Sequence, residues 1–140
     1  MKIGLDIHGV IDEMPEFFSF LTNSIIKNGG EVHIITGSHW DEKTDKNMED
    51  WDIKFTHKFS VYDYLMESSY TKTGLIQFPD GTIQTKFEDE LWDRIKGEYC
   101  EKNGISLHID DTLAYNKYFN TSYANLNLNN KKQKKSHKDI

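Results

Sequence analysis

The chain has 140 residues, one cysteine and a formal net charge of −6, and 36% of its residues are hydrophobic. This length suits one domain with its own core, and a single cysteine excludes both an internal disulfide and a multi-cysteine zinc site. Cys100 lies in a segment of helical pattern, which predicts a packed, inert thiol. We find no basic and apolar leader and no apolar run as long as a membrane span, so we expect a cytoplasmic protein without membrane contact.

The charge is unevenly distributed along the chain. Residues 125–140 hold five basic and one acidic residue, so residues 1–124 hold twelve basic and twenty-two acidic residues, a net charge of −10. An acidic body disfavours extended nucleic-acid binding and suits a site that gathers carboxylates around a divalent cation. The Asn- and Lys-rich composition predicts a disordered tail over residues 127–140, after a single domain of residues 1–126.

The first third of the chain predicts a strand, a helix and a second strand. Apolar residues predict a strand over residues 3–7, which contains Asp6 and breaks at Gly9. Pro15 begins a predicted helix over residues 15–27, and residues 31–36 form a strand that ends at Thr36. Because the two strands of a strand–helix–strand unit are parallel, Asp6 and Thr36 are expected at the same edge of the sheet.

The middle of the chain predicts a charged helix over residues 41–51, a short strand over 53–56 and a helix over 59–66. Two β-rich runs then flank Asp80-Gly81, which predicts a β-hairpin over about residues 74–86. Two interpretations of this hairpin stay open. It is either a lid over one end of the sheet or an extension of the sheet edge.

The last part predicts a helix over residues 88–102 and a strand over 105–109 that enters Asp110 and Asp111. A helix over residues 112–119 and an edge strand over 121–126 follow. The alternation of strands and helices indicates an α/β fold with a mainly parallel sheet.

Polar residues follow three of these strands at the edge where parallel strands end. They are Asp6, Thr36, Gly37, Ser38, Asp110 and Asp111. Carboxylates gathered there repel one another unless a cation holds them, and Mg²⁺ prefers carboxylate oxygens, backbone carbonyls, water and phosphate. The hydroxyls and the amides near Gly37 suit an anion such as phosphate.

Three motifs in this order resemble those of the haloacid-dehalogenase-like (HAD) superfamily, whose members are mostly magnesium-dependent phosphatases and phosphotransferases. The motifs are Leu5-Asp6-Ile7-His8-Gly9-Val10, Ile34-Ile35-Thr36-Gly37 and Leu107-His108-Ile109-Asp110-Asp111. The resemblance covers about residues 2–123. It implies a three-layer α/β sandwich with a Rossmann-like, mainly parallel sheet, in which the hairpin is a minimal cap.

The resemblance also implies roles for individual residues. Asp6 would be the nucleophile that forms an aspartyl-phosphate, and Thr36 with Gly37 and Ser38 would bind the phosphoryl group. Mg²⁺ would be held by the carboxylates of Asp6, Asp110 and Asp111 and by the backbone carbonyl of His8.

The family also uses a lysine to orient the nucleophile. We predict Lys86 for this role, because it begins the helix before the last motif and lies 24 residues before Asp110. Lys58 and Lys72 are the alternatives.

The chain departs from the family at His8, where the family has a second aspartate that is usually the general acid and base. Imidazole, with an ordinary pKa of about 6.5, can also protonate a leaving oxygen and activate water. The predicted function is therefore a Mg²⁺-dependent phosphatase, acting on a small phosphorylated substrate or on the terminal phosphate of a larger molecule. The alternatives are a weak or inactive metal- and phosphate-binding protein and a haloacid-type dehalogenase, which the pair of Asp110 and Asp111 disfavours.

The other histidines have simpler interpretations. His33 and His108 lie inside predicted strands and are expected to pack in the sheet. His39 follows Ser38 and either touches a substrate or belongs to a loop that covers the site. A zinc site of His8, His39 and the aspartates lacks the spacing of a metal-binding histidine pair.

Overall fold

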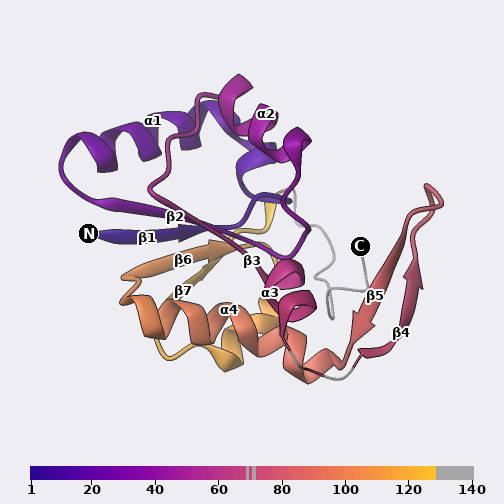
Figure 1. The fold of residues 1–140 in the computed structure, drawn as a ribbon. Helices are drawn as coiled ribbons and strands as arrows, with labels where there is room; N and C mark the ends of the chain where they lie inside the picture. The colour runs from indigo at the N-terminus through magenta and orange to yellow at the C-terminus, as the bar shows by residue number, and fades with distance from the viewer. Residues whose placement is uncertain (69, 71, 129–140) are drawn as a thin grey trace.

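The computed structural model describes residues 1–68, 70 and 72–128 (Figure 1). The strands are β1 (Lys2–Leu5), β2 (Glu31–Thr36), β3 (His57–Ser60), β4 (Lys72–Gln77), β5 (Ile83–Phe87), β6 (Leu107–Asp110) and β7 (Ser122–Asn125). The α-helices are α1 (Pro15–Lys27), α2 (Glu42–Asp50), α3 (Val61–Glu67) and α4 (Asp89–Asn103). Two short 3-10 helices are η1 (Ile11–Glu13) and η2 (Leu113–Tyr118).

Five strands form one parallel sheet in the order β3-β2-β1-β6-β7. Helices α1 and α2 cover one face of the sheet, and α3 and α4 cover the other (Figure 1). The predicted α/β fold with a mainly parallel sheet is therefore confirmed as a three-layer, Rossmann-like sandwich. In such a sheet all five strands end at the same edge, which is where α/β proteins bind ligands.

Each face of the sheet has its own apolar core. On the side of α1 and α2, the core contains Phe18, Val32 and Met48. On the opposite side, Leu65 of α3 packs with Leu91 of α4. Each fully buried side chain of this size contributes about 1.5–3 kcal/mol, so the two cores fix the sheet between its helices.

Local sequence signals explain where the helices begin and end. Pro15 occupies the first position of α1, where its missing N–H costs no hydrogen bond. At the start of α2, Asp41 and Thr44 form a reciprocal capping box. Helix α4 is followed by Gly104, whose φ of 65° is left-handed and therefore suits glycine.

Two predicted elements differ in the structure. The short strand predicted over residues 53–56 lies at β3 instead, because the left-handed residue Asp52 precedes a turn in which the Ile53 amide bonds to Met48. Thr56 then joins the chain to β2 by a hydrogen bond from its amide to the Val32 carbonyl. The helix predicted over residues 112–119 is the 3-10 helix η2.

Strands β4 and β5 form a separate antiparallel pair that projects beyond the five-stranded sheet (Figure 1). The interpretation of the hairpin as an extension of the sheet edge is therefore wrong. Its base is anchored by Phe87, which is fully buried, and by a hydrogen bond from the Thr85 amide to the Tyr62 hydroxyl (3.3 Å). At its tip Gly81 has a φ of 89°, which glycine adopts without strain.

Within the described ranges, no helix combines the length and the apolar character that a membrane crossing requires. Of the tail predicted over residues 127–140, positions 129–140 lie outside the described residues.

Candidate active site

Three carboxylates meet at the edge where the parallel strands end. Asp6 directly follows β1, Asp110 is the last residue of β6, and Asp111 comes next. One oxygen from each of the three lies within 4.8 Å of the others. Asp6 is 6% exposed and Asp110 is fully buried, so these charges are largely removed from water. The structure thus brings together the acids that the sequence placed at one edge.

A lysine from α4 joins two of these carboxylates. The Lys96 Nζ donates to Asp6 Oδ1 (3.1 Å) and to Asp110 Oδ2 (2.7 Å), and it lies 5.4 Å from the centre of the Tyr115 ring. Lys96 is itself buried, so its ammonium depends on these two acids and on the ring for compensation.

This arrangement shifts the pKa values of its members in different directions. Burial, followed by the charge of Asp110, raises the pKa of Asp6 to about 8 despite the neighbouring Lys96. Burial acts in the same sense on Asp110, but the charge of Lys96 and a hydrogen bond from His108 keep the pKa of Asp110 well below its usual range. Burial opposes the charge of Lys96, yet the attraction of Asp110 and Asp6 raises its pKa. Lys96 therefore stabilises the ionised form of Asp110 well and that of Asp6 poorly.

Asp110 is the better fixed of the two buried acids. His108 Nε2 lies 2.9 Å from Asp110 Oδ2, and the Thr112 amide donates to Asp110 Oδ1 (3.1 Å). The prediction that His108 packs in the sheet is confirmed, since it is fully buried and stacks on Phe119 with ring centres 5.3 Å apart. The Nε2 atom of His108 also holds the Asp110 carboxylate in place.

The turn after β1 brings His8 and Gly9 to the same place. Gly9 has a φ of 83°, and a Cβ at this position would overlap the carboxylate of Asp111. Only glycine allows the backbone to approach this acid so closely. The His8 side chain is 62% exposed and lines the cavity above Asp6, with its Nδ1 3.5 Å from Asp12 Oδ2.

The residues predicted to bind phosphate follow β2. Gly37 and Ser38 line the same cavity as Asp6, and a Cβ on Gly37 would lie 3.1 Å from the Trp92 ring. Thr36 is buried, and its hydroxyl accepts a hydrogen bond from the Ser38 amide (3.2 Å). Thr36 thus shapes the loop that Gly37 and Ser38 present to the cavity.

The cavity has a volume of about 310 Å³ and lies between the strand ends and the hairpin. Trp92 and Tyr115 form an aromatic wall, and they are joined by a hydrogen bond from the indole Nε1 to the hydroxyl (3.3 Å). The hairpin adds residues from its tip and from β5, which are Phe78, Asp80, Thr82 and Gln84. The hairpin therefore borders the same space as Asp6, as expected for a lid.

The lysine beside Asp6 is not the one that the sequence favoured. Lys86 lies on β5, where it pairs with Gly74, while Lys96 reaches Asp6 from α4. Of the alternatives, Lys58 lies 5.0 Å from the Trp40 ring and Lys72 is exposed on β4. The helix was correctly predicted, but it begins at Asp89, so Lys86 lies within β5 and does not begin the helix. The lysine that contacts Asp6 lies ten residues further along the chain, within α4.

A signal for Lys96 was present in the sequence. Trp92, Lys96 and Cys100 are spaced by four residues, so they share one face of α4, and all three are buried. A lysine on the buried face of a helix requires acidic partners. Cys100 is packed as predicted, and burial raises the pKa of its thiol to about 12.

His39 belongs to a loop contact with α3. Its Nδ1 lies 2.6 Å from Asp63 Oδ1, and the Trp40 amide donates to the other oxygen of Asp63 (3.0 Å). The hydrogen bond to Asp63 raises the pKa of His39. These contacts place residues 39–40 in a loop held against α3, and neither residue lines the cavity at Asp6.

The charges of the cluster suit a hard divalent cation. Three carboxylates and one ammonium leave a net charge of −2 if all are ionised, and Asp6 ionises with difficulty in this setting. Carboxylate oxygens are the ligands that Mg²⁺ prefers, and it usually shares them with water and a substrate phosphate. The residues present therefore fit such an ion.

Comparisons of this chain with protein-family models, with curated proteins and with solved structures gave no significant match.

Proposed function

We propose that this protein is a Mg²⁺-dependent phosphomonoester hydrolase of the HAD type, which acts through an aspartyl-phosphate on Asp6. The observation that carries this proposal is the meeting of Asp6, Asp110 and Asp111 within 4.8 Å at the end of a parallel sheet. Their order along the chain and their strand context match the motifs that resemble this superfamily.

The carboxylates of Asp6, Asp110 and Asp111, with the backbone carbonyl of His8, would hold Mg²⁺. When bound, Mg²⁺ supplies positive charge that favours ionised Asp6 and neutralises the phosphoryl group. The raised pKa of Asp6 supports this assignment, because a nucleophile that holds a proton up to about pH 8 needs a further cation to react near neutrality.

Asp6 performs the covalent step in this proposal. One of its carboxylate oxygens attacks phosphorus, and the bond between phosphorus and the leaving oxygen breaks. Water then attacks the phosphorus of the aspartyl-phosphate, so the bond to Asp6 breaks and inorganic phosphate leaves. Lys96 orients the Asp6 carboxylate through the 3.1 Å contact with its Oδ1. Gly37 and Ser38, which line the cavity, would contact the phosphoryl oxygens.

His8 handles the proton in both steps. It gives a proton to the leaving oxygen in the first step and takes one from the attacking water in the second. Its exposed side chain at the cavity wall supports this role. Removing a general acid and base of this kind lowers turnover by about 10²–10⁴-fold, so we expect a loss in this range for His8→Ala.

The cavity indicates the class of substrate. A volume of about 310 Å³ lies at the lower end of small-molecule sites, and aromatic and polar residues share its wall. We infer a small phosphorylated compound whose organic part contacts Trp92 and the hairpin, which acts as a minimal cap. The terminal phosphate of a larger molecule is the alternative, reached through the open side of the cavity.

Phosphate release from an aryl phosphate tests the proposal directly. We expect steady release that requires Mg²⁺, and we expect Asp6→Asn to reduce it by about 10³-fold or more. Asp50→Asn is a matched control, because Asp50 is an exposed acid on α2 that pairs with Lys46. Undiminished turnover by Asp6→Asn, with the same dependence on Mg²⁺, would contradict the proposal.

A second candidate function is binding of Mg²⁺ and phosphate without turnover. A contact of the His8 imidazole favours it, because its Nδ1 lies 3.5 Å from Asp12 Oδ2, which holds a ring that would otherwise handle the proton. This candidate predicts that Mg²⁺ raises the melting temperature while the wild type releases no phosphate, and that His8→Asp creates activity. A dehalogenase is disfavoured because a metal-free site leaves buried acids poorly compensated, and halide release that resists a chelator would revive it.

A further inference from the structure

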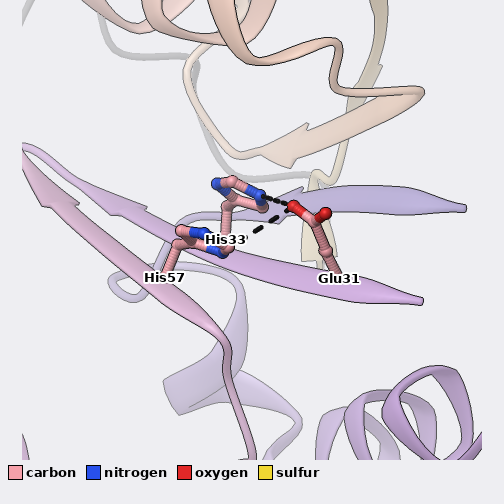
Figure 2. A group of neighbouring side chains, drawn as sticks. All are labelled: Glu31, His33 and His57. Carbon is pink, nitrogen blue, oxygen red and sulfur yellow. Dashed lines mark hydrogen bonds and ion pairs between the residues drawn. The ribbon is translucent and has the colours of Figure 1, made fainter. Parts of the chain in front are cut away.

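A second cluster of metal-binding side chains lies at the opposite edge of the sheet, where the strands begin. Glu31 is the first residue of β2, and His33 follows two residues later on the same face of the strand. His57 is the first residue of β3 and is the register partner of His33. Figure 2 shows the three side chains together on one face of these neighbouring strands.

The distances among the three side chains approach those of a tetrahedral metal site. His33 Nε2 lies 2.9 Å from Glu31 Oε1, and His57 Nδ1 lies 3.8 Å from the same oxygen. One ligand atom from each residue lies within 4.8 Å of the others. Zinc bonds of about 2.0–2.1 Å at tetrahedral angles separate two ligand atoms by about 3.3 Å, between the two measured values.

The surroundings of His33 are also those of a metal ligand. Its ring is buried, and its second nitrogen, Nδ1, lies 2.7 Å from the Tyr99 hydroxyl on α4. A histidine that binds a metal through one nitrogen is almost always held by a hydrogen bond at the other, which fixes its tautomer and its orientation. When an ion takes the place of the Nε2 proton that Glu31 otherwise accepts, Tyr99 is in position to accept from Nδ1–H.

We propose that Glu31, His33 and His57 form a binding site for a divalent transition-metal ion of the Zn²⁺ class, separate from the carboxylate cluster at Asp6. Two imidazoles and one carboxylate suit such an ion better than Mg²⁺, which prefers oxygen ligands. Lys2 approaches Glu31 at its other oxygen, Oε2 (3.8 Å), and so leaves Oε1 to the histidines.

Binding replaces two existing contacts, which are the hydrogen bond between His33 Nε2 and Glu31 Oε1 and the contact of His57 Nδ1 with the Thr56 hydroxyl (2.9 Å). It also requires one ring to turn. The rings of His33 and His57 are stacked, with centres 4.2 Å apart and planes within 5° of parallel. An ion lies close to the plane of each imidazole that binds it, so one ring has to turn. His57 is the ring that turns, because it is 50% exposed on the edge strand β3, whereas His33 is held by packing and by Tyr99.

An ion at this site joins the edge strand β3 to β2. Three protein ligands leave a fourth position for water. Because the ligands come together only in the folded chain, binding stabilises the fold in proportion to the logarithm of the metal concentration. We therefore expect Zn²⁺ to raise the free energy of unfolding whether or not the protein is catalytically active.

Titration calorimetry of the full chain with ZnCl₂, in excess Mg²⁺ to compete at the carboxylate cluster, tests the proposal. We expect one Zn²⁺ per chain at this site, and we expect His57→Gln to weaken its binding by roughly tenfold or more. The control is His39→Gln, which removes another exposed histidine, one that pairs with Asp63. Asp6→Asn is expected to bind Zn²⁺ at this site as the wild type does, so a failure of the proposed hydrolase is distinguishable from a failure of this site.

Nitrogen-15 spectra of the imidazoles identify the ligands without relying on affinity. On addition of Zn²⁺ we expect the Nε2 resonance of His33 and the Nδ1 resonance of His57 to shift, with little change at His39. These spectra are recorded on the wild type, so they identify His33 as a ligand without a substitution that disturbs folding. Equal Zn²⁺ binding by the wild type and His57→Gln, or zinc-induced shifts confined to other histidines, would overturn the proposal.

Discussion

The two edges of the sheet gather ionisable side chains in different ways. At the edge where the strands end, Asp6, Asp110 and Lys96 come from distant parts of the chain and are all buried. At the edge where they begin, Glu31 and His57 are more accessible and lie on adjacent strands. The first cluster offers hard oxygen ligands with one ammonium, and the second offers nitrogen and oxygen ligands together. Under the two proposals, one sheet therefore carries two sites that suit different metal ions.

The pKa shifts follow the same division. Burial and the charge of Asp110 raise the pKa of Asp6, which leaves an acid that is poorly compensated without a cation. At the other edge, a hydrogen bond from His33 lowers the pKa of Glu31, and burial lowers that of His33. In the second cluster a hydrogen bond already joins His33 to Glu31, whereas in the first a single ammonium faces three carboxylates. This difference explains why we place the chemistry at the first.

Removing the buried cation has the largest expected effect. Lys96→Met leaves Asp6 and Asp110 without their shared partner, and breaking a buried ion pair from one side costs about 3–5 kcal/mol. We expect this loss in the free energy of unfolding measured with urea, together with a loss of phosphate release. Lys86→Met is expected to change stability by only about 0.5 kcal/mol, because Lys86 lies on the hairpin. Equal effects of the two substitutions would contradict the assignment of Lys96.

Two glycines with the same backbone conformation provide a matched pair. Gly9 and Gly29 both have a φ of 83°, but a Cβ on Gly9 would overlap Asp111, whereas a Cβ on Gly29 meets open space. Both alanine variants incur the left-handed strain of about 1–2 kcal/mol. Gly9→Ala should in addition displace the Asp111 carboxylate and weaken Mg²⁺ binding, measured by calorimetry. If Gly29→Ala weakens Mg²⁺ binding as much, Asp111 has no part in holding the ion.

The stability of the metal-free protein should depend on pH through Asp6. Its pKa of about 8 in the folded state lies above the ordinary value of 3.8, so the folded chain retains a proton that the unfolded chain loses. The contribution of Asp6 to the free energy of unfolding therefore falls as pH rises from about 4 to about 8, by roughly 2 kcal/mol or more, whereas His33 and His108, whose pKa values burial lowers, act in the opposite sense. The difference between the wild type and Asp6→Asn in urea unfolding at about pH 5 and about pH 8 measures this contribution.

Asp6→Asn and Mg²⁺ are the controls for that measurement. The amide does not titrate, so the variant should lack this part of the pH dependence, and excess Mg²⁺ should reduce it in the wild type. A wild type and an Asp6→Asn variant with the same pH profile would show that the Asp6 carboxyl is not held in its protonated form.

The smallest expected effect concerns the edge where the strands begin. Lys2 places its ammonium 3.8 Å from Glu31 Oε2, at a partly exposed position where such a charge contributes about 0–1 kcal/mol. Lys2→Met should therefore tighten Zn²⁺ binding by up to about fivefold, because a charge that repels the ion is removed. Weaker Zn²⁺ binding by this variant would be inconsistent with an ion at Glu31.

The strands that carry the acids could be predicted from the sequence because each is a short apolar run that ends in a polar residue. The parallel arrangement then placed Asp6 and Asp110 at one edge without further information. Lys96 could not be assigned from the apolar pattern of its helix, because that pattern predicts the helix but does not identify the partners of a lysine within it. The spacing of Lys96 from Trp92 and Cys100 does place it on the buried face.

The cluster of Glu31, His33 and His57 could not be predicted in the same way. Its formation depends on the register of β2 against β3, and β3 begins four residues later than its apolar pattern indicated. The hydrogen bonds of Thr56 with Val32 and the left-handed Asp52 determine that position. Such contacts between distant residues leave little trace in the composition of a short strand. Without knowledge of these contacts, the sequence indicates only an isolated surface histidine at position 57.

The most direct measurement is the mass of the peptide that contains Asp6 after acid quenching of the protein during turnover of an aryl phosphate with Mg²⁺. We predict that this peptide gains the mass of one phosphoryl group in the wild type, that the adduct accumulates in His8→Ala, and that it is absent from Asp6→Asn. A phosphoryl group on another residue, or rapid turnover with no adduct on Asp6 in either the wild type or His8→Ala, would contradict the account.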